Sequence, residues 1–313
     1  MTVLGIDTSC YTTSVAAAGQ DGVICSHRKL LPVQQGTRGL RQSEAVFAHL
    51  RQLPDLYAAA IASLAGRPID AVCVSVRPRD GEDSYMPVFR TGAAFARVAA
   101  ETLRVPLIET THQRGHVRAA LEDSGLSAAR YLALHLSGGT TEALLMRDDA
   151  LTLLSGTRDL HAGQLIDRVG VALGLPFPAG PYLEELAGKG SARSLLPVSM
   201  EGDDCHFSGA EARAMRWIAQ KELPPEDIAA EVFSLVARTA LRLLSAAADK
   251  TGVDDSLLTG GVASSQLFRD MVCEINRRRR LGLRLCFGQR QYAGDNAAGV
   301  ALIGRDHMME GNP

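Results

Sequence analysis

Two histidines four residues apart, His112 and His116, have the spacing of a pair of metal ligands. Side chains at positions i and i+4 of a helix lie on one face, so both imidazoles could bind one ion. Asp295, which follows a glycine and precedes several small residues, is the candidate for a third ligand. Two histidines and one carboxylate would leave coordination positions open, as a catalytic metal requires. A chance helical pair and a carboxylate that caps a helix are the alternatives.

Three segments rich in glycine and hydroxyl side chains could bind a nucleotide. Within residues 4–14, a strand pattern ends in Asp7 and Ser9, which could sit beside a phosphate and orient a metal or water. Residues 134–142 resemble a hairpin around paired glycines, and residues 258–265 pass through two glycines into a helix N-terminus. An ordinary turn also explains each segment alone. Together, and in this order, they match the two phosphate hairpins and the adenosine loop of the actin/sugar-kinase fold.

The elements that would position these segments repeat one plan twice. In each half, three early antiparallel strands are followed by alternating helices and strands, which predicts an α/β protein of the actin/sugar-kinase (ASKHA) fold with two similar lobes. We expect an N-terminal lobe of residues 1–123, completed by the C-terminal helix 295–313, and a C-terminal lobe of residues 124–294. The expected strands are 2–6, 13–18, 23–27, 71–76, 106–109, 131–136, 142–146, 151–154, 256–258 and 283–286; the expected helices are 42–64, 91–103, one from 112, 162–173, 181–187, 210–221, 225–249, 264–277 and one from 296, with an irregular segment at 195–208.

The composition narrows the class of protein. The chain has 313 residues, enough for two domains, and a net charge of −2, so no overall basic field attracts nucleic acid. Its 6 cysteines include no C-x-x-C pair, which favours a reducing compartment. The sequence contains neither a signal-peptide pattern nor an apolar run of about 20 residues, so we expect a cytoplasmic protein without a membrane partner.

Four consecutive arginines, Arg277, Arg278, Arg279 and Arg280, end one of the expected helices. Positive side chains at a helix C-terminus complement the helix dipole, and this is the simpler interpretation. The alternative is a local patch that contacts the phosphates of an RNA.

The motifs taken together closely resemble the TsaD (Gcp, glycoprotease-like) family, the bacterial counterparts of the KEOPS catalytic subunit. The matches run in the family's order and cover nearly the whole chain. The resemblance implies an enzyme that transfers a threonylcarbamoyl group from its adenylate to N6 of the tRNA adenosine that follows the anticodon. The matching segments are LGIDTSC at 4–10, H-x-x-x-H at 112–116, LSGGTTE at 136–142, the segment at 162–186, HFSG at 206–209, TGGVASS at 259–265 and GDNAAGVA at 294–301.

The resemblance also implies cofactors, partners and site residues. A divalent iron or zinc ion would be held by His112, His116 and Asp295, with Asp7 and Ser9 as catalytic residues. ATP or an acyl-adenylate is the implied nucleotide. The four arginines could contact tRNA, and a TsaB-like protein or a second copy of the chain could bind the N-terminal lobe. The family's ligand-binding residues map onto Ser137, Gly138, Gly139, Asp167, Gly180 and Gly261. We expect Thr140, Glu184, Gly260 and Ser265 to bind substrate or nucleotide as well.

The chain departs from the family's pattern at several positions. Residues 77–87 replace a glycine-proline-glycine loop, so Arg77, Arg79 and Tyr85 could line a rewritten pocket or belong to a surface loop. The changes favour two alternatives: a paralogue that acts on a different small-molecule or acyl acceptor, or a non-catalytic partner of a TsaD-like complex. Retention of all three candidate metal ligands argues against the non-catalytic partner. The other departures are Tyr11, Thr12, Thr111, Thr140, Glu142, Glu184 and Ser265.

Overall fold

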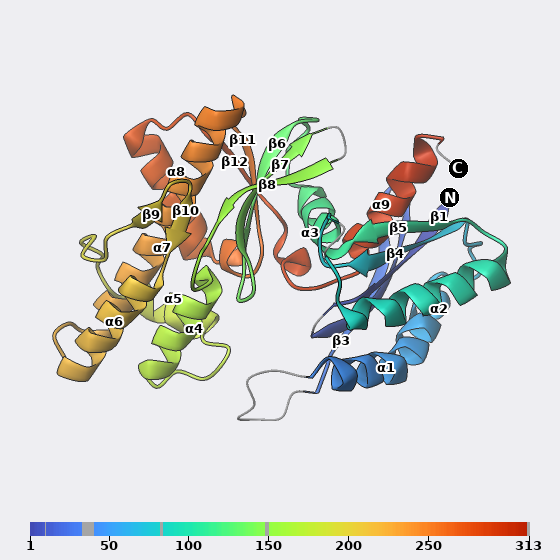
Figure 1. Cartoon of the computed structure of the whole chain (residues 1–313), viewed down its shortest axis with the longest axis horizontal. Helices are drawn as coiled ribbons and strands as arrows, with labels where there is room; N and C mark the ends of the chain where they lie inside the picture. The colour runs from blue at the N-terminus through green and yellow to red at the C-terminus, as the bar shows by residue number, and fades with distance from the viewer. Residues whose placement is uncertain (10, 33–40, 82–83, 148–149, 312–313) are drawn as a thin grey trace. The chain divides into compact units, whose positions relative to one another are not determined.

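The computed structural model describes residues 1–9, 11–32, 41–81, 84–147 and 150–311. These residues form two compact units, which are taken separately below: unit 1 comprises residues 1–122 and 294–313, and unit 2 comprises residues 123–293. Each unit contains a five-stranded mixed sheet flanked by helices (Figure 1). The α/β architecture predicted from the sequence is therefore present in both units.

The sheet of unit 1 has the strand order β3-β2-β1-β4-β5, in which β1, β2 and β3 are antiparallel and β4 and β5 run parallel to β1. Successive residues of β1 point to opposite faces: Leu4 packs in the same apolar cluster as residues of α1 and α2, whereas Val3 packs with α9. The elements are β1 (Thr2–Thr8), β2 (Thr12–Gly19), β3 (Gly22–Leu30), α1 (Gln42–Ser63), β4 (Ala71–Arg77), α2 (Pro87–Leu103), β5 (Leu107–Thr111), α3 (His112–Leu121) and α9 (Ala298–Met309).

The end of the chain returns to its beginning in unit 1. Helix α9 lies on β1, at the opposite end of the sequence, as Figure 1 shows by colour. The close approach requires glycine, because a Cβ at Gly5 would lie 2.5 Å from the backbone nitrogen of Ala301. This packing fixes the position of the segment just before α9.

The sheet of unit 2 has the order β12-β11-β6-β7-β8, which repeats the topology of unit 1. Strands β6, β7 and β8 are antiparallel, and β11 and β12 run parallel to β6. The long helix α7 supplies much of the buried apolar core. The elements are β6 (Tyr131–Leu136), β7 (Thr141–Arg147), β8 (Ala150–Gly156), α4 (Ala162–Ala172), α5 (Gly180–Ala187), β9 (Ser199–Glu201), β10 (Asp204–His206), α6 (Ser208–Gln220), α7 (Pro225–Thr251), β11 (Asp255–Thr259), η1 (Val262–Ser264), α8 (Gln266–Arg279), β12 (Arg284–Phe287) and η2 (Arg290–Tyr292).

Two sequence predictions about these elements were wrong. The segment 195–208 is not irregular throughout, because β9 and β10 form an antiparallel pair within it. Its strands are too short and too polar to produce a clear alternating pattern. Helix α2 begins at Pro87, before the expected start at residue 91, since proline is favoured in the first turn of a helix. Among the described residues, no helix has the length and apolarity to cross a bilayer.

Candidate functional site

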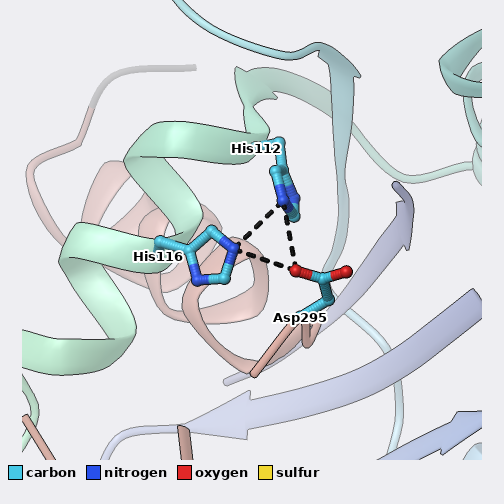
Figure 2. Close-up of side chains that lie close together, drawn as sticks. All are labelled: His112, His116 and Asp295. Atoms are coloured by element: carbon cyan, nitrogen blue, oxygen red, sulfur yellow. Dashed lines mark hydrogen bonds and ion pairs between the residues drawn. The ribbon is translucent and has the colours of Figure 1, made fainter. Parts of the chain in front are cut away.

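The two histidines of α3 and the carboxylate before α9 come together in unit 1. The Nε2 atoms of His112 and His116 lie 3.0 Å apart. Asp295 Oδ1 lies 3.6 Å from Nε2 of His112 and 3.3 Å from Nε2 of His116. Figure 2 shows all three side chains pointing at one another. The cluster is mostly shielded from solvent, because the side chains of His112, His116 and Asp295 are 19%, 6% and 29% exposed. The structure thus groups the three residues that the sequence analysis named as metal ligands.

The crossing of α3 and α9 brings these residues together. Strand β5 runs directly into α3, and Thr111 caps the helix by accepting a hydrogen bond from the backbone nitrogen of Arg114. The two helices meet where each has a glycine: a Cβ at Gly299 would lie 1.8 Å from the carbonyl oxygen of Gly115. Any larger residue at this point would push α9, and Asp295 with it, away from the histidines.

Asp7 and Ser9 lie behind the cluster and hold its members in place. The carboxylate of Asp7 is fully buried, and its Oδ1 accepts hydrogen bonds from Nδ1 of His112, at 3.0 Å, and from the hydroxyl of Ser75. The hydroxyl of Ser9 donates to Oδ2 of Asp295 at 3.1 Å. A carboxylate that binds one ring nitrogen of a histidine fixes the tautomer that presents the other nitrogen to an ion. Both residues, expected to be catalytic, therefore contact the candidate ligands from behind.

The charges of the cluster shift two pKa values in opposite directions. Burial by itself would lower the pKa of His112, but the charge of Asp7 and hydrogen bonds to Asp295 and Asp7 raise it well above the usual value for histidine. Burial would raise the pKa of Asp295, but hydrogen bonds to both histidines hold it well below the usual value. In the metal-free chain, this shift favours the protonated form of His112, whose ring nitrogens face the carboxylates of Asp7 and Asp295.

The loop that departs from the family pattern is tied to α3. Asp80 accepts hydrogen bonds from Nε of Arg114, at 2.9 and 3.1 Å, and from the hydroxyl of Thr111 at 3.2 Å. The backbone of Gln113 also donates to the carbonyl of Pro78 at 2.9 Å. We call Asp80, Thr111 and Arg114 the loop clamp. It braces the first turn of the helix that carries His112. The other residues that were considered for a rewritten pocket, Arg77, Arg79 and Tyr85, are exposed, and Glu82 and Asp83 lie outside the described residues.

A buried network that the sequence analysis missed supports the β1–β2 hairpin. The hydroxyl of Thr13 lies 2.8 Å from Nδ1 of His49 and donates to Oε1 of Gln52 at 2.7 Å. Burial lowers the pKa of His49. The sequence did contain a signal, because His49 and Gln52 are three positions apart and lie on the same face of α1 as the buried Leu53. Their partner on the hairpin, Thr13, could not be predicted from the sequence.

In unit 2, the two glycine segments lie at the carboxyl ends of neighbouring parallel strands. Ser137–Thr140 connects β6 to β7, and Gly260 and Gly261 follow β11, which pairs with β6. Gly138, Gly139 and Gly261 are exposed, and a Cβ at any of them would meet no atom within 4 Å. Gly260 differs: its φ is +97°, and a Cβ would lie 2.3 Å from the carbonyl oxygen of Leu136. Open backbone at the carboxyl ends of strands is where α/β folds bind ligands.

The other residues expected to bind the nucleotide make hydrogen bonds inside unit 2. Oδ1 of Asp167 accepts from the backbone nitrogen of Ala179 at 2.8 Å, next to Gly180, the first residue of α5. Burial raises the pKa of Asp167. Glu184 accepts from the backbone nitrogen of Leu267, and the hydroxyl of Ser265 caps α8. The side chains of Glu184, from α5, and Ser265 thus both accept hydrogen bonds at the N-terminus of α8.

The four consecutive arginines differ in their surroundings. Arg277 and Arg278 form ion pairs with Glu274, at positions i+3 and i+4 from it. Arg280 has a left-handed backbone and ends the helix. Arg279 lines a separate cavity in unit 2.

Comparisons with solved structures agree on the fold. HypF from T. kodakarensis aligns with a TM-score of 0.66 at 15% identity, over 99% of this chain and 48% of that protein. A ROK family glucokinase from Streptomyces griseus aligns with a TM-score of 0.55 at 13% identity, over 98% of this chain and 100% of the glucokinase. These likenesses confirm the predicted ASKHA fold.

Comparisons with protein sequences identify the family. Two tRNA N6-adenosine threonylcarbamoyltransferases, from Methanopyrus kandleri and Archaeoglobus fulgidus, are 31% and 29% identical over 97% of this chain, which covers 87% and 90% of their lengths. A probable bifunctional tRNA threonylcarbamoyladenosine biosynthesis protein from Thermoplasma volcanium is 29% identical, and the chain spans only 56% of it. The TsaD family model matches residues 27–302. The chain therefore belongs to the TsaD family of transferases, the tRNA N6-adenosine threonylcarbamoyltransferases.

Proposed function

We propose that this chain transfers a threonylcarbamoyl group from an adenylate to N6 of an adenosine in tRNA, with a divalent metal ion bound by His112, His116 and Asp295. Family membership supports the reaction. The convergence of three ligand atoms within 4.8 Å of one another is the observation that carries the metal site. Because the ligands are two imidazoles and one carboxylate, iron and zinc are the fitting ions.

The distances within the cluster fit one ion. Ligands about 2.0–2.1 Å from a tetrahedral ion are about 3.3 Å from one another. The three ligand separations in the cluster are 3.0, 3.3 and 3.6 Å. The two Nε2 atoms face each other, so their lone pairs would repel unless a proton or a metal ion lies between them. Asp7 supports the metal-binding tautomer because it accepts the Nδ1 proton of His112.

In the proposed reaction, N6 of the adenosine attacks the carbamoyl carbon of the adenylate, the bond from that carbon to the phosphate oxygen breaks, and N6 loses one proton as AMP departs. When bound, the ion would supply a Lewis acid for the carboxylate or carbamate oxygens of the donor. Asp7 and Ser9 keep His112 and Asp295 in position, so the ligands need not reorganise during the reaction.

The glycine segments of unit 2 are the proposed nucleotide site. The exposed backbone of Gly138, Gly139 and Gly261 can approach phosphate oxygens without interference from side chains. We expect Thr140 to contribute its hydroxyl there. Asp167, Glu184 and Ser265 would act mainly by holding α5 and α8, because their oxygens already accept backbone hydrogen bonds.

Unit 1 also offers a surface for the partner expected from the sequence, a TsaB-like protein or a second copy of the chain. Phe47 and Leu50 of α1 are 71% and 54% exposed, and Val98 of α2 is 68% exposed. Large apolar side chains on neighbouring surface helices are typical of interaction sites. With tRNA as its substrate, the chain is expected to work in the cytoplasm.

Complementation tests the proposed function. The chain should restore threonylcarbamoyladenosine in the tRNA of cells depleted of their own TsaD, measured by mass spectrometry of the nucleosides. A His112→Ala/His116→Ala variant expressed at the same level should not restore it. If the wild-type chain is well expressed and carries metal but leaves tRNA unmodified, the reaction uses another acceptor and the proposal is wrong.

A further inference from the structure

A cavity of about 490 Å³ in unit 2 is dominated by arginine side chains. It lies between β9, α7 and the end of α8. No acidic side chain of the described residues lines it. Its walls are Val198, Met200, Arg238, Arg242 and Arg279.

Two of these arginines have no acidic partner among the described residues, which follows from their positions in their helices. Glu274 pairs with Arg277 and Arg278, and Arg279 is one position too far along α8 to reach it. In α7, Arg242 is exposed and has Arg238, a second cation, one turn before it. Within the part of the chain that the structure describes, neither Arg242 nor Arg279 forms an ion pair. Arg242 and Arg279 therefore bring positive charge to this cavity that no acid among the described residues offsets through an ion pair.

The third arginine is held rigidly at the cavity wall. Nη2 of Arg238 donates to the carbonyl oxygen of Leu196 at 2.7 Å, and Nε lies 3.4 Å from the hydroxyl of Ser234. The nearby acid of α7, Glu231, is buried and accepts backbone hydrogen bonds from the segment before β9. Burial lowers the pKa of Arg238, and the charge of Arg279 lowers it further while Glu231 opposes the shift. The cations thus repel one another, and an anion in the cavity would relieve that repulsion.

We propose that this cavity, the three-arginine pocket, binds a phosphate group of an RNA strand. Guanidinium groups match phosphate oxygens in geometry, and three of them line this cavity. An RNA backbone fits better than a neutral ligand because the cavity has no acid to accept a polar hydrogen. The chain carries a net charge of −2, so RNA binding requires a local site of this kind. The identification of RNA as the source of the phosphate rests on the proposed function, which makes tRNA the substrate.

The test compares two double variants that each remove two charges from exposed arginines. Arg242→Gln/Arg279→Gln alters the pocket, whereas Arg277→Gln/Arg278→Gln alters the two arginines of the same run that share an ion pair with Glu274 and lie outside the pocket. The affinity of the whole chain for a fluorescent tRNA transcript is measured by anisotropy between 50 and about 200 mM salt. The pocket variant should bind at least about tenfold more weakly, with a salt slope smaller by about one, because the pocket binds one phosphate. The control variant should stay within about threefold of wild type.

Further measurements separate the possible failures. Equal affinities of the two variants for tRNA would overturn the inference, and unchanged tRNA modification by both would show that the proposed function survives. Inorganic phosphate and ATP are used as competitors: if the pocket variant loses binding to them at millimolar concentration but binds tRNA normally, the pocket takes a free anion and the RNA assignment is wrong. Failure of wild type to bind or modify tRNA would overturn both proposals. Equal thermal midpoints of all three proteins exclude misfolding as the cause of any difference.

Discussion

The two units use the same hairpin in different ways. In unit 1, the hairpin between β1 and β2 carries Asp7 and Ser9, whose side chains hold two candidate metal ligands. In unit 2, the corresponding hairpin between β6 and β7 presents Gly138 and Gly139, which have open space in place of side chains. One topology thus provides a candidate site made of side chains in one unit and a candidate site made of backbone in the other. The first depends on hydrogen bonds between particular side chains. The second depends on the open space beside Gly138 and Gly139.

The largest expected effect comes from removing a ligand in unit 1. His112→Ala should reduce the bound metal of the purified protein to background. It should also lower the rate of tRNA modification by more than about 100-fold, because loss of a residue that only supports a metal ligand already costs about 10–100-fold. Metal is measured by mass spectrometry after dialysis, and activity by nucleoside analysis.

The matched control is His27→Ala, which removes a histidine of the same unit whose contact is the hydroxyl of Ser63. It should keep both the metal and the activity. A His112→Ala protein that retains stoichiometric metal would show that the side-chain site of unit 1 is not a metal centre.

The next effect separates structure from binding within the backbone site of unit 2. Gly260→Ala should lower the free energy of unfolding by about 2–4 kcal/mol, because its φ is +97° and the new Cβ would lie 2.3 Å from a carbonyl oxygen. Gly139→Ala should change it by less than about 0.5 kcal/mol, because no atom lies within 4 Å. The measurement is denaturant unfolding.

The same pair should behave differently in nucleotide binding. Calorimetry with ATP should find weaker binding for Gly139→Ala despite its normal stability, since the added methyl group blocks approach to the backbone. If Gly139→Ala binds ATP as wild type does, the open hairpin is not the nucleotide site, and the contrast between the two units loses its functional meaning.

The sequence could predict features that depend on local patterns of residues. The order of elements and the glycine segments were predicted because hydrophobic periodicity and paired glycines are local patterns. His112 and His116 were found by their spacing, and Asp295 was chosen as the third ligand because it precedes small residues at an expected helix N-terminus; the structure brings all three together. Whether a metal binds there stays a prediction.

Contacts between distant residues were out of reach. Nothing in the sequence connects Ser75 to Asp7, or Asp80 to Arg114, because such pairs form only when β4 and α3 pack in unit 1. The three-arginine pocket was missed for the same reason. The sequence drew attention to the four consecutive arginines, whereas Arg238 and Arg242, on another helix, share the cavity with just one of them.

A smaller effect is expected from the loop clamp, which ties the loop of residues 77–87 to α3. Arg114→Gln removes the ion pair with Asp80 and should loosen the first turn of α3, so metal affinity should fall by about tenfold while the fold is retained. The measurement is a competition titration with a chelator. Arg77→Gln, in the same loop but exposed, is the control and should change the affinity by less than twofold, or about 0.4 kcal/mol. Equal metal affinities of the two variants would mean that the loop clamp does not support the metal-binding end of α3.

The smallest effect is a pH dependence of opposite sign in the two units. The pKa of His112 is raised in the folded, metal-free chain, so its stabilising contribution is complete below the ordinary histidine value of about 6.5 and is lost as pH rises through the raised value. Asp159 in unit 2 has a lowered pKa despite partial burial, because the hydroxyl and backbone of Ser208 and other backbone N–H groups donate to it. Its contribution is complete above about 3.9, the ordinary value, and is lost as pH falls toward the lowered value.

Thermal unfolding of metal-free variants measures both signs. The difference in Tm between wild type and His112→Gln should shrink from pH 6 to pH 9, whereas the difference between wild type and Asp159→Asn should be constant there and shrink below pH 4. A change of about 1 kcal/mol corresponds to about 2–4 °C for a domain of this size. Adding metal should reverse the first dependence, because an ion must displace the proton on His112 and therefore binds more tightly as the pH rises. A difference for His112→Gln that does not vary with pH would mean that the metal-free side-chain site holds no proton, and the proposed exchange of proton for metal in unit 1 would be wrong.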